Sequence, residues 1–262
     1  MRKFGYLFNQ QLKQMFISPS TYIAAFLFLT FMGVMYLYSL IEVSRGTIGR
    51  SPTEIFLSAF WIPVLFMVPL LTMRSLSEER RMGTLGTMMT TPVTAFEIVL
   101  SKFLAAYFFY ALLWAATLVF PLTTSLYLPQ ASADSRLLFS EQAVTGYIFI
   151  LISGAMYVSI GIFASSLTRT TFVAGMLSFG MLFLAIVGAG LVSKFPAEST
   201  GALSWLGPAV SYVDTFKHLD EFTGALLDTR PFFFYLSTAA VFVAFTSLIT
   251  ESKNCLLYTS DA

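Results

Sequence analysis

Residues 20–41 have the sequence STYIAAFLFLTFMGVMYLYSLI, which contains no Asp, Glu, Lys, Arg or His. The hydrocarbon layer of a bilayer is about 30 Å thick, and a helix needs roughly 20 apolar residues to cross it. Five further stretches meet this requirement, at residues 55–73, 102–126, 144–166, 171–192 and 231–250. A chain in lipid must satisfy its backbone hydrogen bonds internally. The sequence therefore predicts an all-α, polytopic membrane protein with six transmembrane helices.

The composition of the whole chain excludes a water-soluble globular protein. Of its 262 residues, 56% are hydrophobic and only 11% are charged, and the mean hydropathy is +0.76. A soluble domain carries about 25% charged residues. The 15 Lys and Arg against 14 Asp and Glu leave a net charge of +1, which argues against a nucleic-acid partner. The partner that this composition indicates is the lipid bilayer.

Metal and redox chemistry lack their usual ligands in this sequence. Cys255 is the one cysteine and His218 the one histidine, so an internal disulfide, a zinc cluster and a haem pair are excluded. We therefore expect no cofactor and no metal on this chain. For His218 we expect an exposed loop or helix position rather than a role as a ligand.

The last eight residues, at 255–262, read CLLYTSDA and resemble the translated read-through of a sequencing adaptor. They are polar and unpatterned, and they follow the last apolar stretch. We expect a single membrane domain at residues 1–254 and a tail at 255–262 that is not native.

The residues before the first apolar stretch predict an interfacial helix. Arg2 and Lys3 precede an interrupted amphipathic segment rather than the apolar core of a cleavable signal. The apolar side chains of this segment share one helical face: Phe4, Phe8, Leu12 and Met15. Such a helix suits the plane of the membrane interface. The alternative is a frayed polar leader.

Start signals and prolines punctuate the predicted spans. Three stretches follow helix-start sequences: Ser18-Pro19, Ser51-Pro52-Thr53-Glu54 and Arg230-Pro231. Within the spans, Pro63, Pro69 and Pro121 are expected to loosen or bend their helices.

The Lys and Arg residues near the ends of the spans predict the orientation. With both termini inside, nine of these cations lie on the cytoplasmic side: Arg2, Lys3, Lys13, Arg74, Arg80, Arg81, Lys102, Arg169 and Lys253. Six lie outside: Arg45, Arg50, Arg136, Lys194, Lys217 and Arg230. The inside segments are also shorter, so we expect cytoplasmic N- and C-termini.

Apart from Lys102 at a boundary, the six stretches contain no ionisable Asp, Glu, Lys, Arg or His. Ion-coupled carriers bind their ion near the middle of the bilayer, and intramembrane hydrolases need a nucleophile with a base or a metal. The sequence therefore argues against both classes, and we expect no catalytic site.

Small residues at four-residue spacing in span four, such as Ala155 with Ser159 and Gly161 with Ser165, suit either packing within the chain or a dimer interface.

The segment at residues 73–97, between spans two and three, reads MRSLSEERRMGTLGTMMTTPVTAFE. Ser75 with Glu78 and Thr94 with Glu97 have the spacing of capping boxes, and Pro92 interrupts the chain between them. We expect two short helices and a joint on the cytoplasmic side, with Leu85, Met88 and Met89 forming a small apolar patch. A rigid protrusion attached to two spans can receive force from a soluble partner.

At these residues the sequence resembles the ABC-2 type permeases, the membrane subunits of one class of ATP-binding-cassette exporters. The shared pattern consists of Arg74, Ser77-Glu78-Glu79-Arg80, Gly83-Thr84-Leu85, Thr91-Pro92-Val93 and Lys102. Gly86 departs from it, because the family usually has Glu there; the exchange removes one charge and costs about 1 kcal/mol of helix propensity. Residues 218–230 also resemble the branch of gliding-motility-associated and nitrous-oxide-reductase-maturation permeases.

The resemblance implies a permease of an ATP-driven exporter in the bacterial cytoplasmic membrane, with two ATPase subunits beneath two permease subunits. The second permease is either an identical or a different chain. It also implies a coupling helix, and the residues we expect to couple it to the ATPase are Arg74, Glu78, Glu79, Arg80, Gly83, Thr84, Thr91 and Pro92. ATP and Mg²⁺ are then bound by the partner ATPase, since the sequence contains no Gly-x4-Gly-Lys-Ser/Thr phosphate loop.

Two other hypotheses remain. The first is a membrane anchor that recruits an ATPase or envelope machinery without moving a substrate. For the coupling residues themselves, the alternative is a charged loop that only fixes topology. The second is a membrane enzyme, which would need polar residues converging within the bilayer.

Overall fold

The structure is a computed structural model that describes residues 2–45, 51–84, 94–127, 141–188, 190, 214–223 and 229–260. All the regular secondary structure in these ranges is helical, which confirms the all-α prediction. The elements are α1 (Arg2–Ile17), α2 (Pro19–Ser44), α3 (Pro52–Ser58), α4 (Trp61–Thr72), α5 (Ser77–Met82), α7 (Ala95–Thr117), α8 (Val119–Tyr127), α9 (Glu141–Leu167), α10 (Thr171–Phe183), the π-helix η1 (Leu184–Gly188), α13 (Thr215–Thr223) and α14 (Thr229–Ser260).

Five helical segments of the described chain are long and apolar enough to cross a bilayer. They are α2, α7 with α8, α9, α10 with η1, and α14. Helix α3 and the segment Trp61–Met82, of which α4 is the apolar part, meet at a bend of 51° and make a sixth span if the pair is counted as one. The structure thus supports five or six of the six predicted spans, and each of them overlaps a stretch that the sequence indicates.

Proline accounts for two breaks in these spans. A proline inside a helix removes one hydrogen bond and clashes with the carbonyl four residues earlier. For Pro63, the carbonyl four residues earlier belongs to Ala59, and the bend between α3 and α4 lies at this residue. In the same way Pro121 stands four residues after Thr117, the last residue of α7. Pro69, in contrast, lies inside α4.

Two of the predicted helix starts show the expected capping bonds. The Ser51 hydroxyl accepts a hydrogen bond from the Glu54 amide at 3.3 Å, with Pro52 at the first helical position. At the start of α7, Thr94 and Glu97 form a reciprocal capping box, with distances of 3.3 and 3.1 Å. These bonds satisfy helix-end amides that have no partner inside the helix.

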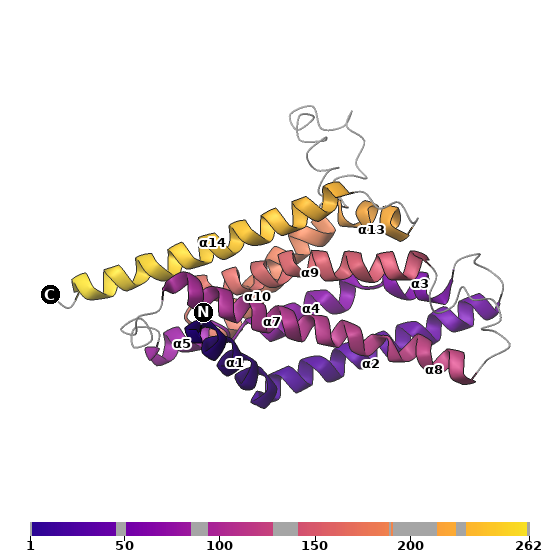
Figure 1. The fold of residues 1–262 in the computed structure, drawn as a ribbon, viewed down its shortest axis with the longest axis horizontal. Coiled ribbons are helices and arrows are strands. Elements are labelled where there is room, and N and C mark those ends of the chain that lie inside the picture. The colour runs from indigo at the N-terminus through magenta and orange to yellow at the C-terminus, as the bar shows by residue number, and fades with distance from the viewer. Residues whose placement is uncertain are drawn as a thin grey trace, which may run out of the picture.

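Helix α9 is the centre of the bundle (Figure 1). In its apolar window 78% of the residues are buried, against 22% to 39% in the other long spans. It packs against α14, α10, α7, α13 and α4. The outer helices α2, α10 and α14 expose large apolar side chains such as Phe26, Phe172 and Phe233. In a bilayer these faces contact lipid acyl chains.

Two glycines of α9 let neighbouring helices approach it closely. A Cβ atom added at Gly154 would lie 2.1 Å from the Tyr110 ring of α7. A Cβ atom at Gly161 would lie 2.4 Å from the Thr72 hydroxyl at the end of α4. Both distances are shorter than any normal contact. These small residues of span four therefore serve packing within the chain.

Replacing Gly154 by Ala should destabilise the protein by about 1–3 kcal/mol, because the added methyl group must displace the buried Tyr110 ring. Gly180→Ala is the matched control, since a Cβ atom there meets no atom within 4 Å. Unfolding of the detergent-solubilised protein by SDS would measure both changes. Equal stability of the two variants would contradict this packing.

Several segments gather at one end of the bundle. Both termini, α1, α5 and the start of α7 lie toward this end (Figure 1). Helix α1 packs on α7, with Phe8, Leu12 and Met15 of its apolar face partly buried while Lys13 is exposed. The amphipathic pattern of α1 is thus confirmed, and its position in the membrane interface stays a prediction.

The expectation that His218 is exposed was wrong. His218 lies in α13 and is only 7% exposed, with its Nδ1 atom 3.2 Å from the Tyr235 hydroxyl of α14. Its residue type favours the surface, but the packing of α13 against α9 places it in the interior. Among the described residues, no group of three or more His, Cys, Asp or Glu could hold a metal ion.

The tail at 255–262 follows the last span without a break in helical structure. Helix α14 continues to Ser260. A helical conformation does not distinguish native from adaptor-encoded residues, so the domain limit at residue 254 stays a prediction.

Candidate functional site

The charged segment after α4 folds into a short helix because its sequence matches the helix dipole. Glu78 and Glu79 stand in the first turn of α5, and Arg80 and Arg81 stand in its last turn. Gly83 ends the helix with φ of 70°, a left-handed conformation that glycine adopts without strain. The sequence thereby produces a compact helix joined to α4 by a turn at residues 73–76.

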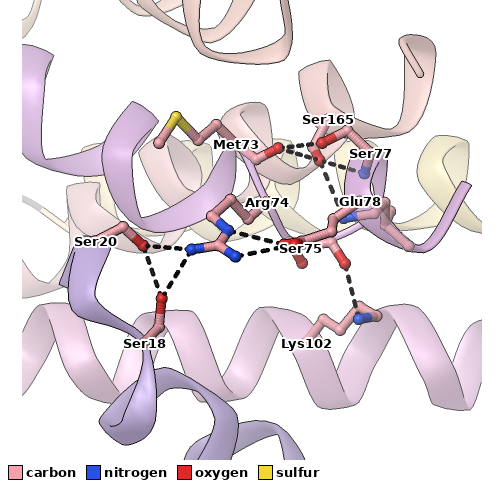
Figure 2. Close-up of polar contacts among 10 residues, drawn as sticks. Ser18, Ser20, Met73, Arg74, Ser75, Ser77, Glu78, Lys102 and Ser165 are labelled. Atoms are coloured by element: carbon pink, nitrogen blue, oxygen red, sulfur yellow. Dashed lines mark hydrogen bonds and ion pairs between the residues drawn. The ribbon is translucent and has the colours of Figure 1, made fainter. Parts of the chain in front are cut away.

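Arg74 connects this segment to the start of α2. Its guanidinium donates two hydrogen bonds to the Glu78 carboxylate, Nε to Oε2 at 2.7 Å and Nη2 to Oε1 at 2.9 Å. The remaining nitrogen, Nη1, donates to the hydroxyls of Ser18 at 3.2 Å and Ser20 at 3.4 Å (Figure 2). The predicted Ser75–Glu78 capping box is therefore wrong: Leu76 occupies the cap position, and the Glu78 carboxylate binds Arg74 instead.

Lys102 connects α5 to α7 and α1. Its ammonium donates to the Glu79 carboxylate at 2.6 Å, to the Ser75 carbonyl at 2.8 Å and to the Gln11 side-chain oxygen at 3.3 Å. The side chains of Lys102 and Glu79 are only 3% and 12% exposed. Three acceptors match the three donors of an ammonium group, so this buried charge is fully hydrogen-bonded.

Ser165, near the end of α9, connects α5 to the centre of the bundle. Its hydroxyl accepts hydrogen bonds from the amides of Leu76 and Ser77, both at 3.1 Å. It also donates to the Met73 carbonyl at 3.2 Å, and the Ser77 hydroxyl donates to the same carbonyl (Figure 2). The Ser165 side chain is fully buried. One hydroxyl thus satisfies two amides that the first turn of α5 leaves without a helical partner.

The ion pairs border a pocket of about 420 Å³ between α1, the start of α2, the end of α4, α5 and α7. Gln11, Ser18, Arg74, Glu79 and Lys102 are among the residues that line it. Because apolar packing does not fill this corner, the polar bonds are the main connection between α5 and the helices across the pocket.

The charged groups that follow the span differ in their electrostatic surroundings. The hydrogen bonds from Arg74, and its positive charge, lower the pKa of the Glu78 carboxyl below its ordinary value. Burial, followed by the charge of Arg169, lowers the pKa of the Arg80 guanidinium below its ordinary value. Glu78 is therefore held in its charged form, whereas Arg80 carries its charge in an unfavourable position.

The structure brings three predicted coupling residues together with Lys102: Arg74, Glu78 and Glu79. Arg80 follows them on α5 but makes no bond to this cluster, and Gly83 and Thr84 are exposed at the end of the helix. The Thr84 hydroxyl donates to the Glu79 carbonyl at 3.4 Å. Thr91 and Pro92, with the patch of Leu85, Met88 and Met89, lie outside the described residues.

Sequence reasoning missed four polar partners: Gln11, Ser18, Ser20 and Ser165. The sequence pattern indicates only a helix start at Ser18, and only a small residue that permits close packing at Ser165. Ser165 stands 89 positions from Leu76, so the spacing of residues along the chain carries no signal of this contact.

The chain matches the family described as ABC-2 family transporter protein over residues 7–250. It belongs to this family, and it is a multi-pass membrane permease of the ABC transporter class. No match was found among curated proteins. Permeases of this family are typically non-catalytic membrane subunits that associate with an ABC ATPase.

Replacing Lys102 by Met should destabilise the protein by about 3–5 kcal/mol, because it leaves the buried Glu79 carboxylate without its cation. The double variant Lys102→Met/Glu79→Gln should recover part of this loss, since both charges are removed. Arg45→Gln is the control: Arg45 is 67% exposed in its pair with Glu42, and such surface pairs contribute at most about 1 kcal/mol. A double variant as unstable as Lys102→Met, measured by SDS-induced unfolding, would contradict this interpretation.

Proposed function

We propose that this chain is the permease subunit of an ATP-driven exporter, and that α5 with the residues around it couples the spans to a separate ABC ATPase. The observation that carries the proposal is the attachment of α5 to α7 and α9 through the buried polar groups of Lys102 and Ser165, and to the start of α2 through the partly exposed Arg74. Membership of the ABC-2 family supports it. So does the absence of a phosphate loop from the sequence, because the motor must then be another polypeptide.

The bonds around α5 suit the transmission of force. Ser165 holds the first turn of α5 to α9, the most buried span. Lys102 holds the same helix to α7, and Arg74 holds it to the start of α2. A displacement of α5 by a docked ATPase would therefore move three spans together, since packed helices respond as rigid elements.

The charge distribution supports a cytoplasmic position for α5. Cations gather at this end of the bundle: Lys13, Arg74, Arg80, Arg81, Lys102 and Arg169. Lys and Arg are enriched in cytoplasmic segments, so we propose that this end and both termini face the cytoplasm of a bacterial cell. We also propose that the permease pairs with a second permease subunit and that transport is outward.

The proposal is tested with the full chain and the ABC ATPase that co-purifies with it, reconstituted in lipid nanodiscs. Spin labels at Tyr38 and Val144, in a Cys255→Ser background, report on the end of the bundle opposite α5; both sites are exposed. ATP should change the distance between these labels. A permease that binds no ATPase would overturn the proposal. ATPase binding without any such change would favour the membrane anchor.

Replacing Ser165 by Ala should uncouple the two subunits, because the amides of Leu76 and Ser77 lose their shared acceptor on α9. We expect the ATP-dependent rearrangement to weaken about 5-fold or more while the ATPase still binds. Ser159→Ala is the matched control, since the buried Ser159 hydroxyl bonds only the Met156 carbonyl of its own helix. Equal behaviour of the two variants, at equal amounts of folded protein, would show that Ser165 does not transmit the motion.

A further inference from the structure

The carboxylates of α5 are both committed to other cations. Glu78 binds Arg74, and Glu79 binds Lys102. Among the described residues, neither Arg80 nor Arg81 forms an ion pair with these carboxylates, although the charge of Arg81 acts on Glu78. Because α5 carries equal numbers of acidic and basic residues, its sequence alone suggests a neutral helix, and only the ion pairs show that positive charge is left over.

Arg80 holds part of this uncompensated charge in a desolvated position. Its Nη2 atom is buried and has no hydrogen-bond partner among the described residues. A buried charged donor without a partner is unfavourable. Helix α5 packs against α9 and α10, and the short connection between those two helices carries Arg169. The positive charge of Arg169 acts on Arg80 and makes its charged form less favourable still.

Apart from Glu78 and Glu79, the neighbouring sequence supplies Arg80 with no acidic side chain. Among the described residues, Oε2 of Glu79 is buried without a hydrogen-bond partner, but the other oxygen of this carboxylate binds Lys102. No Asp or Glu occurs in the sequence from Arg80 to Phe96. The next one, Glu97, caps the start of α7. Counting Arg74, Arg80, Arg81, Lys102 and Arg169 against Glu78 and Glu79, this corner of the described structure has an excess of positive charge.

We propose that Arg80 and Arg169 form a site for a carboxylate side chain of the ABC ATPase, which enters when the ATPase docks on α5. This inference rests on the proposed function and names the chemistry of the contact. A guanidinium binds a carboxylate through two parallel hydrogen bonds. Nη2 of Arg80 is buried without a partner among the described residues, but the residue as a whole is only partly buried, so a rotation of its side chain on docking would present this nitrogen to the carboxylate. The carboxylate would relieve the repulsion between the two arginines, so docking would be favoured by a charge arrangement that the free permease tolerates poorly.

The position of the site favours a protein carboxylate over a lipid headgroup. Arg169 lies in a connection between two spans, and Arg80 lies on the helix that follows a third. Helix α5 lies at the end of the bundle that also holds α1 and the start of α7 (Figure 1). A soluble subunit docked on α5 would reach the exposed Arg169, whereas the apolar faces that contact lipid are those of the outer helices.

The test measures the affinity of the ATPase for the full permease in nanodiscs, with Arg80→Gln and Arg169→Gln as variants. We expect each to weaken binding by about 10-fold or more, and the loss should shrink at high salt. Arg80→Lys should bind with intermediate affinity, because it keeps the charge without the planar fork. Arg45→Gln is the control, since Arg45 lies at the far end of α2.

A second arm identifies the partner group. Selection for ATPase variants that restore binding to Arg169→Glu should return replacements of Asp or Glu by Lys or Arg. Arg169 is exposed, so this variant remains informative if a change at Arg80 prevents folding. Unchanged ATPase affinity of both Gln variants would overturn the inference, as would a loss confined to phosphatidylglycerol binding measured by native mass spectrometry. A wild-type permease that binds no ATPase would instead overturn the proposed function.

Discussion

A single buried ammonium group organises the end of the molecule at which α5 lies. Lys102 lies in the first half of α7, and its three hydrogen bonds reach α1, α5 and the turn between α4 and α5. Withdrawing a charge from water is costly unless the charge is paired and hydrogen-bonded. The chain segments that supply these acceptors are therefore held in one arrangement, and α5 has a defined position although it is only six residues long.

The centre of the bundle extends this connection through the membrane. Helix α9 begins at the end opposite α5 and ends beside it. There the Ser165 hydroxyl accepts hydrogen bonds from the amides at the start of α5. Along its length, Gly154 and Gly161 leave room for Tyr110 and Thr72 of the neighbouring helices. Close packing without voids transmits displacement rather than absorbing it.

The charges at the α5 end divide into two groups with different consequences. Arg74 and Lys102 are paired with the carboxylates of Glu78 and Glu79, and they connect α5 to neighbouring helices of the same chain. The charge of Arg169 acts on Arg80, whose Nη2 atom has no hydrogen-bond partner among the described residues. The first group holds the permease together, and the second is the one that we propose to bind the ATPase. A cation belongs to the first group if the fold places a carboxylate beside it, and to the second group if it does not.

The spans, the proline breaks and the caps at Ser51 and Thr94 could be predicted from the sequence, because they depend on apolar length and on residues within one turn of each other. The pairing of Glu78 could not: a capping box and an ion pair with Arg74 both suit the local spacing, and the fold selected the ion pair. The burial of His218, the hydrogen bonds of Ser165 and the effect of Arg169 on Arg80 depend on the placement of distant segments.

Sequence determined which segments enter the bilayer, since that follows from their own hydrophobicity. Tertiary structure decided which polar groups meet, since that follows from how the helices pack.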